Sequence, residues 1–494
     1  METIELLKAA LAKGVPEDAL LKAWTQSASA TSGLTAYDLE APAKSLVPII
    51  TPLRNALPRV GGGKGIQANW RAITGINTSN VSAGVSEGNR GGVTTTSTAD
   101  YLAAYKGIGL EDYVTFEADY AAQGFDDVRA RAVTNLLSAL MLQEERIILG
   151  GNSTLALGTT PTPTATDSST GGALGSAQTL SVIAVALTLE GYMNSSVAAG
   201  VSASVSRTNA DSSTDSYGGG AAQKSAAASV TLSGGASLHS IQASLTAVRG
   251  AFAYAWYAGT SGAETLNKIT TINSAVITAM NSAGQAASAL PSSDKSSNTL
   301  VFDGFLTQIA KTSGNAYFAT QSTGTPGTGT PLTADASGGI SEFDTALQSF
   351  WDNYRLSPSE IWVSSQEMNY IRKKVLTGSS NAAQRFVFQA AQAGFMGGTM
   401  IKGYTNPFTM AGAAEIPIKL HPNMPPGTVM FMTDKLPYPL SNVTNVNQIR
   451  TRREYYQLEW PLKSRKYEYG VYADEVLQCY FPPSLGVITN IAAG

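Results

Sequence analysis

Residues 125–149 carry the clearest helical pattern of the chain, and this pattern limits the possible folds more than any other feature. Apolar side chains recur there at intervals of three and four residues: Val133, Leu136, Leu137, Leu140, Met141, Ile147 and Ile148. Asp126 and Asp127 place negative charge on the first turn, where the helix dipole is positive, and Gly150–Gly151 offers a left-handed stop beyond the last turn. The sequence therefore predicts a long, half-buried helix with both ends specified locally.

The composition indicates a protein whose surface is largely covered by neighbours. The chain has 494 residues, enough for two or three cored domains, and 43% of them are apolar, which excludes a largely disordered polymer. Only 14% are charged, so burial of its faces against other copies costs little desolvation, although a β-rich extracellular adhesin would share this profile. With 33 basic and 36 acidic residues the net charge is -3, and no overall positive field recruits nucleic acid.

The cysteine and histidine counts exclude two kinds of site. The single cysteine, Cys479, cannot form an intrachain disulfide, and the two histidines, His239 and His421, cannot build the usual structural zinc site. Glu2 and Glu5 are acidic where a secretory signal would be basic, and no uninterrupted apolar run is long enough to span a membrane. We therefore expect a protein that folds in a reducing cytoplasm and is neither secreted nor inserted in a membrane.

The N-terminal part is predicted to be a helix followed by an arm. Residues 1–24 place Ile4, Leu7 and Leu11 on one stripe. This stripe needs a partner, either within its own domain or on a neighbouring subunit or a scaffold. Residues 26–66 contain several prolines and small side chains, and we expect them to form an extended arm rather than a unit with its own core.

Between residues 66 and 120 the pattern predicts β-structure. Alternating runs at residues 68–73 and 113–118 indicate the two arms of a long hairpin. The segment between them includes the polar run Thr94–Ser97 and cannot form a core of its own. We therefore expect this loop to project from the body.

Residues 160–290 are rich in Ser, Thr, Ala and Gly and contain alternating runs, as at residues 181–187. Tyr254, Trp256 and Tyr257 supply the large side chains that a core there needs. We expect an inserted immunoglobulin-like or fibronectin-like β-sandwich that folds by itself, with loose junctions at Gly171 and Gly172 and near Gly284.

After residue 298 the pattern returns to mixed α and β. A helix is predicted around Phe343, and Ser364 and Glu367 form a capping-box pattern at the start of another helix. Strands are predicted at residues 360–363, 416–420, 428–431 and 467–472.

No motif for catalysis or cofactor binding emerges. Gly61–Gly65 is similar to a phosphate-binding loop, but Pro58 and Gly65 break the required pattern, so a flexible hinge is the better interpretation. His239 lies beside a β run and His421 precedes a proline in a turn, and both are expected to be structural. We predict that the protein is not an enzyme and has no catalytic, cofactor-binding or metal-binding residues.

Two charged clusters are interpreted as packing surfaces. Glu144 and Glu145 lie in the predicted long helix beside Arg146, where a solvated face or a subunit contact explains them. Residues 450–456 mix arginines and tyrosines as nucleic-acid-binding segments do, but Glu454 interrupts the charge. We expect a subunit interface there, because arginine and aromatic side chains anchor interfaces.

The order of these segments resembles that of tailed-phage major capsid proteins of the Hong Kong 97 type. The resemblance is carried by the projecting hairpin, the long helix ending in LQEERIILGGN at residues 142–152, and the mixed α/β body. The segment Ile418–Thr428, the sequence EWPL at residues 459–462 and residues 467–472 are similar to the closing strands of such subunits. The likeness covers residues 30–155 and 295–490.

The resemblance implies an α+β fold of the Hong Kong 97 type with an N-terminal arm, an extended loop, a peripheral domain with a long spine helix, and an axial domain. The implied divisions are 1–61 for the N-terminal helix and arm, 62–115 for the extended loop, 116–159 for the peripheral domain, 160–290 for the inserted all-β sandwich, and 291–494 for the axial domain with the rest of the peripheral domain. The loop would lie over a neighbouring subunit and the arm would reach across another. Lys64 and Lys106 flank the loop, but no partner asparagine can be assigned, and no cross-link is predicted.

The function that the resemblance implies is that of a major capsid protein, self-assembling into the icosahedral head around the double-stranded DNA genome of a tailed phage. The expected partners are other copies of the chain in hexamers and pentamers, portal, scaffolding or decoration proteins, and packaged DNA through non-specific contact, with no membrane. The protein would be made in the host bacterial cytoplasm and reside in the virion capsid. The alternatives are an encapsulin-type compartment shell, and a β-rich adhesin or glycan-binding surface protein.

Overall fold

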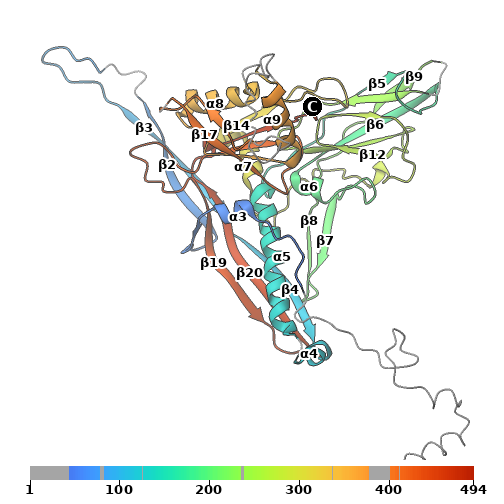
Figure 1. The fold of residues 1–494 in the computed structure, drawn as a ribbon, viewed down its shortest axis with the longest axis horizontal. Coiled ribbons are helices and arrows are strands. Elements are labelled where there is room, and N and C mark those ends of the chain that lie inside the picture. The colour runs from blue at the N-terminus through green and yellow to red at the C-terminus, as the bar shows by residue number, and fades with distance from the viewer. Residues whose placement is uncertain are drawn as a thin grey trace, which may run out of the picture. The chain divides into compact units, whose positions relative to one another are not determined.

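A computed structural model describes residues 44–77, 83–124, 126–234, 238–335, 338–377, 401–410 and 412–494 (Figure 1). The helix predicted at residues 1–24 and the first part of the predicted arm lie outside these ranges. The chain is mixed α and β, as predicted, and it divides into two compact units. The smaller unit comprises Met1–Pro48 and Val114–Arg131, and the larger unit comprises Ile49–Tyr113 and Ala132–Gly494.

The smaller unit contains helix α4, Phe116–Ala122. Thr115 caps this helix because its hydroxyl oxygen accepts a hydrogen bond from the backbone N–H of Ala118 at 3.3 Å. The prediction of a strand over residues 113–118 is therefore wrong from Phe116 onward. Acidic residues in the first turn favour the helix that forms instead.

Helix α5, Val128–Gly150, is the long helix that the sequence predicted. At its start the Asp127 carboxylate accepts a hydrogen bond from the N–H of Ala130 at 3.0 Å, so an acidic residue does mark this end. At its other end Gly150–Gly151 does not adopt the left-handed conformation predicted for it. A side chain on Gly150 would collide with Leu189, so glycine is required there for close packing.

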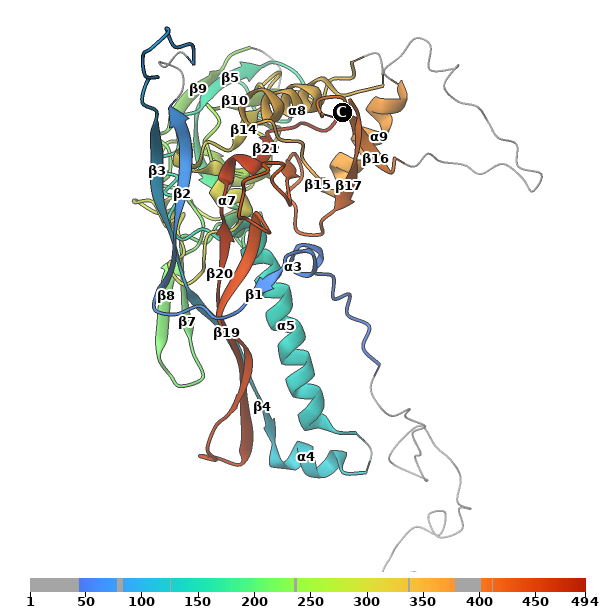
Figure 2. The same cartoon turned by 90° about the vertical axis from the view of Figure 1, so that its left-hand side faces the viewer.

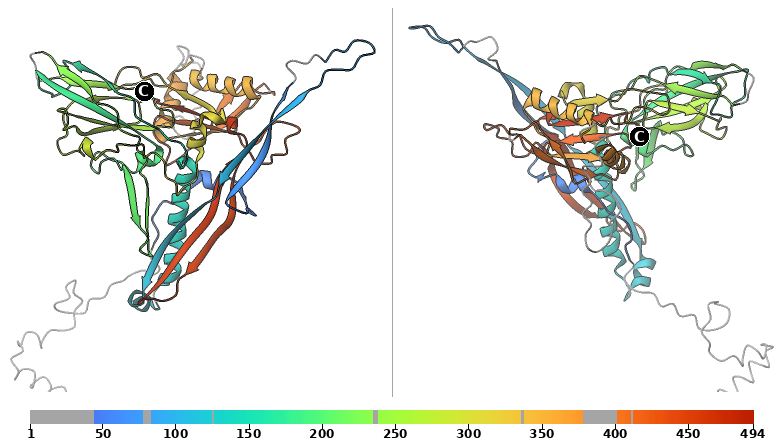
Figure 3. Two further views of the ribbon diagram at one scale, coloured as in Figure 1. Left: turned by 180° about the vertical axis from the view of Figure 1, so that it is seen from behind. Right: turned by 45° about the horizontal axis from the view of Figure 1, so that its top comes forward.

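Strands β2, Gln67–Asn77, and β3, Thr95–Ala104, form an antiparallel ribbon to which no third strand pairs within the described ranges (Figure 3). The predicted hairpin is present, but its second arm is β3 rather than residues 113–118. The pattern missed β3 because its first half is polar, and a ribbon with two exposed faces needs no apolar alternation. Trp70 and Tyr101 face each other across the ribbon with their rings stacked at 5.9 Å.

Helix α5 packs against a four-stranded sheet of order β1-β19-β20-β4 (Figure 2). These strands are β1 (Arg59–Val60), β19 (Asn447–Glu459), β20 (Lys466–Cys479) and β4 (Lys106–Thr115). Leu136 and Leu140 of α5 share an apolar cluster with Ile108 of β4 and with Val471 and Ala473 of β20. One face of the long helix is thus buried, as its apolar stripe predicted.

The C-terminal body is built on a six-stranded sheet of order β14-β21-β18-β15-β17-β16. Its strands are β14 (Tyr317–Thr320), β15 (Glu360–Val363), β16 (Gly403–Asn406), β17 (Ala414–Leu420), β18 (Val429–Met432) and β21 (Leu485–Thr489). Among the described residues of this region the helices are α7 (Phe305–Ala310), α8 (Ser341–Tyr354) and α9 (Ser365–Thr377), with short 3-10 turns at Thr312–Gly314 and Pro482–Ser484. Phe343 and Phe350 of α8 pack their rings 5.5 and 6.2 Å from the ring of Phe431. The helix predicted around Phe343 and the predicted strands of this region are confirmed.

Residues 160–290 contain two main sheets, β13-β10-β5 and β12-β11-β6-β9, and a separate ribbon of β7 and β8. The elements are β5 (Thr164–Ser168), β6 (Gln178–Leu187), α6 (Leu189–Met193), β7 (Ser204–Thr208), β8 (Thr214–Gly218), β9 (Ala228–Leu232), β10 (Ser240–Ser244), β11 (Ala253–Gly259), β12 (Thr265–Thr270), β13 (Ser274–Ile277) and a 3-10 turn at Ala287–Ala289. Trp256 and Ile241 belong to an apolar cluster to which both sheets contribute. Tyr257 and Leu290 belong to a second cluster, on the opposite face of the four-stranded sheet.

The loose junctions predicted for this region are wrong. Side chains on Gly172 or Gly284 would collide with neighbouring backbone oxygens, so both glycines lie within packed structure. The two ends of the region meet instead where the backbone N–H of Asn298 donates to the carbonyl of Asn152 at 2.7 Å. Paired ends of this kind are what an inserted domain requires.

Residues 51–60 pack into the core of the larger unit, so the prediction of an arm without a core is wrong for this segment. Helix α3, Pro52–Ala56, buries Leu53, and Leu57 follows on the same face one turn later. Residues 44–50, by contrast, are largely exposed.

Candidate functional site

Two adjacent glutamates of α5, Glu144 and Glu145, are fully buried in the larger unit. The solvated face that the sequence suggested for them is therefore wrong. They contact segments that lie far apart in the sequence, and we call this group the arm-spine cluster. Its members are Arg54, Arg59, Glu144, Glu145, His421, Tyr455 and Glu475.

Glu145 caps the N-terminus of α3. Its carboxylate accepts hydrogen bonds from the backbone N–H groups of Leu53 at 2.9 Å and Arg54 at 2.8 Å. Thr51 stands at the N-cap position without a side-chain hydrogen bond, so the distant glutamate supplies the acceptor that this helix end lacks. The same carboxylate lies 2.6 Å from Nε2 of His421.

Glu144 is paired with two arginines of the arm. Nε of Arg54 lies 2.9 Å from its carboxylate, and the guanidinium of Arg59 and the hydroxyl of Tyr455 bind the same group. Arg59 also donates to the buried Glu475 of β20 at 2.9 Å. Both guanidiniums lie over the ring of Tyr455, with their carbons 5.3 and 4.9 Å from its centre.

His421 acts as a neutral donor in this cluster. Its Nδ1 accepts a hydrogen bond from the backbone N–H of Asn423 at 3.1 Å, so the ring proton stands on Nε2 and is donated to Glu145. The rigid turn that the sequence predicted around His421 thus fixes the tautomer that Glu145 needs.

Burial shifts the titration of two members of the cluster. The pKa of Glu475 is raised because burial disfavours its charged form, and the nearby Arg59 opposes this shift. Burial likewise raises the pKa of Tyr455, whose hydroxyl donates to Glu144. Removal of one partner from such a buried pair costs about 3–5 kcal/mol, since it leaves a charge without its counter-ion.

The arm-spine cluster fixes the chain at residues 53–59 against α5, which we call the spine helix, and its role is structural. Sequence reasoning missed Arg54, Arg59 and Glu475. The only signal in the sequence for this cluster was the pair Glu144 and Glu145. Adjacent residues of a helix point in different directions, so a single apolar stripe does not explain the burial of both.

The ribbon of β2 and β3 is the second candidate site, because it carries exposed apolar side chains. Ile73, Ile76 and Leu102 are 71%, 67% and 65% exposed. The base of the ribbon is anchored, since the ring of Trp70 packs edge-on against Tyr480 at 5.6 Å. Ile73 and Ile76 lie beyond that base, where little of their own chain covers them, and Leu102 lies beside it, opposite Asn69.

Within the glycine-rich segment Gly61–Gly65 only Gly63 is packed and the other four residues are exposed, so the flexible hinge stays a prediction. The backbone N–H of Gly63 donates to the carbonyl of Thr451 at 3.0 Å, and a side chain on Gly63 would collide with Tyr105. Gly62 and Gly65 have positive φ angles of 81° and 70°, which glycine adopts without strain.

The remaining predicted residues lie in separate places. Arg453 stacks over Tyr456 at 3.7 Å on β19, and whether residues 450–456 meet another subunit stays a prediction. Nδ1 of His239 lies 2.8 Å from the Asp167 carboxylate within the 160–290 region. Lys106, which flanks the loop, donates to a backbone carbonyl at 2.6 Å.

Within the described ranges, no group of three or more His, Cys, Asp and Glu side chains is placed to hold a metal ion. No described helix is long and apolar enough to cross a membrane.

Comparison with known proteins returned solved structures only. No family model and no curated protein matches the chain. The capsid of a native GTA particle is 9% identical and aligns over 95% of this chain and 100% of its own length, with a TM-score of 0.44. The capsid of Myoviridae phage XM1 is 9% identical, over 92% of this chain and 95% of its own, with a TM-score of 0.37.

An encapsulin from Synechococcus elongatus PCC 7942 is similar over a smaller part. It is 10% identical and aligns over 39% of this chain and 57% of its own length, with a TM-score of 0.22. Phage and phage-like capsids, the class that the sequence resembles, are thus among the similar solved structures.

Proposed function

We propose that this chain is the major capsid protein of a tailed phage, which self-assembles into the icosahedral head around a double-stranded DNA genome. The observation that carries the proposal is the ribbon of β2 and β3, in which apolar side chains are exposed on a structure without a second layer. A ribbon of this kind is marginal in water by itself, so it needs a neighbour to cover it.

The energetic case rests on repetition. Burial of an exposed leucine or isoleucine contributes about 1.5–3 kcal/mol, so Ile73, Ile76 and Leu102 would together stabilise one contact by several kcal/mol. Symmetry repeats such a contact at every subunit, and many modest interfaces then hold a closed shell together.

The arm-spine cluster supports the same function from another side. It holds the chain at Arg54 and Arg59 against the spine helix, while Leu46 and Val47, a few residues earlier, are 89% and 65% exposed. We propose that the exposed part of the arm lies on a neighbouring subunit, and that the cluster transmits this contact to the spine helix.

The role that follows is structural rather than enzymatic, and the location is the virion capsid. Other copies of the chain, in hexamers and pentamers, are the main partners in this proposal. Portal, scaffolding and decoration proteins would contact the shell, and packaged DNA would touch its inner face without specific recognition, consistent with a net charge of -3.

Residues 160–290 are proposed to form an inserted β-sandwich on the outer surface of the head. Its support is the paired entry and exit at Asn152 and Asn298, and the two apolar clusters drawn almost entirely from the region itself. An inward position would crowd the packaged genome, so the outward one is favoured.

Electron microscopy of the purified protein tests the proposal. Hexamers, pentamers or closed shells are expected, and a protein that stays monomeric by sedimentation over a wide concentration range would contradict it. The cargo then separates the proposal from an encapsulin-type shell, since particles from infected cells should contain DNA rather than an enzyme.

A further inference from the structure

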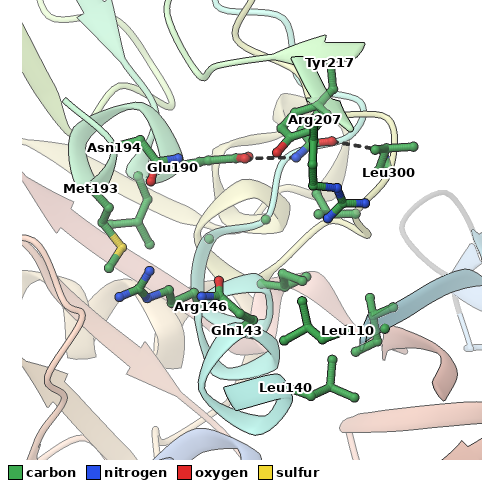
Figure 4. Close-up of a pocket in the computed structure, with 18 of the residues that line it drawn as sticks. Leu110, Leu140, Gln143, Arg146, Glu190, Met193, Asn194, Arg207, Tyr217 and Leu300 are labelled. Carbon is green, nitrogen blue, oxygen red and sulfur yellow. Dashed lines mark hydrogen bonds between the residues drawn. The ribbon is translucent and has the colours of Figure 1, made fainter. Parts of the chain in front are cut away.

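We infer that the first residues of a second copy of this chain dock in a groove beside the spine helix. The groove has a volume of about 390 Å³ and lies between α5, β4, α6 and the ribbon of β7 and β8 (Figure 4). The inference rests on the proposed function, because it requires copies of the chain to pack together.

The lining of the groove combines apolar side chains with one unused cation. Leu110, Met193 and Leu300 are partly exposed and form much of its apolar surface. Arg146 projects from α5 beside Gln143, as Figure 4 shows. No hydrogen bond or ion pair joins the side chain of Arg146 to another residue in the described part of the chain.

The other charged groups at the groove already have partners. Arg207 of β7 is paired with Asp215 at 2.9 Å. Glu190 of α6 accepts a hydrogen bond from the side chain of Asn298 at 2.9 Å. An occupant with an acidic group would therefore find its counter-ion at Arg146.

The segment Met1–Leu11 has the matching chemistry. Its sequence, METIELLKAAL, places the acidic Glu2 and Glu5 among the apolar residues of the stripe noted above. One carboxylate would pair with Arg146, and the apolar side chains would cover the exposed leucines and methionine of the groove. A chain of the 43 residues that precede Lys44 can extend about 140 Å, so the segment can reach a neighbouring copy.

The exposure of Leu46 and Val47 favours a groove on a second copy over the groove of the same chain. Apolar side chains this exposed are expected to be covered by another molecule. Because Met1–Leu11 precedes these residues in the sequence, we infer that it binds the same neighbouring molecule.

Disulfide trapping between two full-length variants tests the docking. Copies carrying Leu7→Cys are co-assembled with differently tagged copies carrying Met193→Cys and are mildly oxidised, while the native Cys479 is buried and does not compete. The matched control replaces Met193→Cys by Thr231→Cys, at an exposed site on β9 outside the groove. We expect about tenfold more interchain product at Met193 than at Thr231, because docking raises the local concentration.

Charge reversal tests the role of Arg146 in the same assay. Arg146→Glu should lower the interchain product about tenfold, and Glu2→Lys with Glu5→Lys in the partner copy should restore it. Arg146 is exposed, so an unchanged melting temperature is expected for the variant.

Three results would overturn the inference. They are equal yields at Met193 and Thr231, a yield that Arg146→Glu leaves unchanged, and a disulfide that forms only within one chain when both cysteines are placed on it. Electron microscopy of the same samples keeps the two proposals apart. Shells without the disulfide overturn the docking alone, and a sample without oligomers overturns both.

Discussion

At the scale of single residues, Glu145 determines where the arm is held. Its carboxylate binds the backbone of Leu53 and Arg54 and the ring of His421, so three N–H donors depend on one buried side chain. A glutamine at position 145 would keep the size of the side chain, but its NH₂ group cannot accept the hydrogen bonds that one carboxylate oxygen of Glu145 accepts now.

We therefore expect Glu145→Gln to lower the free energy of unfolding by about 3 kcal/mol, since a buried, charge-assisted set of hydrogen bonds is broken. Denaturant unfolding of the unassembled protein measures this loss. Glu87→Gln, at an exposed carboxylate, is the control and should change stability by less than about 0.5 kcal/mol. Equal effects of the two substitutions would show that Glu145 does not hold the arm.

Glu367 of α9 is a second buried carboxylate, with a different environment. The hydroxyl of Ser364 accepts a hydrogen bond from the Glu367 N–H at 3.2 Å, so the predicted capping box is half present. The Glu367 carboxylate does not return to the helix start but accepts from the N–H of Gly427 at 3.0 Å. Burial raises the pKa of Glu367 to about 7.

This raised pKa predicts a pH dependence with a definite sign. Between the ordinary pKa of a glutamate and about 7 the folded state binds the proton and the unfolded state does not, so stability falls as pH rises through this window. The loss amounts to about 3 kcal/mol, and it should be absent in Glu367→Gln, which should be the more stable protein at pH 8. Unfolding free energies measured from pH 5 to 8 test this. A wild-type curve parallel to that of the variant would rule out the assignment.

At the scale of elements, the ribbon of β2 and β3 should be dispensable for folding and necessary for assembly. Replacement of residues 73–98 by an Asn-Gly turn would remove Ile73 and Ile76 from the ribbon while leaving Trp70 on Tyr480. We expect the melting temperature to stay within a few degrees and shells to be lost. The matched control removes residues 209–213 at the tip of the ribbon of β7 and β8, which do not line the groove beside α5. Normal shells from the variant with the shortened ribbon of β2 and β3 would show that this ribbon is not necessary for assembly.

The β-structured region should fold alone. A fragment spanning residues 155–298 retains Leu157, which belongs to the core, and Lys295, which pairs with Ala221. We expect a cooperative melt and a β-type circular dichroism spectrum. A non-cooperative melt would remove the independent domain, and antibodies to it that fail to bind intact particles would remove its outward position.

Long periodic elements could be predicted from the sequence, and pairings between distant segments could not. Helix α5 and the core of α8 follow from apolar spacing that is local. Strand β3 was missed because its first half is polar. Glu144 was wrongly predicted to be solvated because its partners Arg54 and Arg59 lie about 90 residues earlier in the sequence. Local patterns carry no information on such a contact, which tertiary packing alone decides.

At the scale of the whole molecule, the chain has well-packed cores together with apolar surface that its own fold leaves open. The cores explain why each subunit folds, and the open surface on the ribbon and at Leu46 explains why it should not remain alone. Modest contacts repeated by symmetry would close a shell from such subunits.

Electron microscopy of the purified full-length protein tests this central claim most directly. The account predicts capsomer rings or closed icosahedral shells, with sedimentation dominated by species much larger than the 51.4 kDa chain. A single monomeric species at all concentrations, with no particles on the grid, would contradict it.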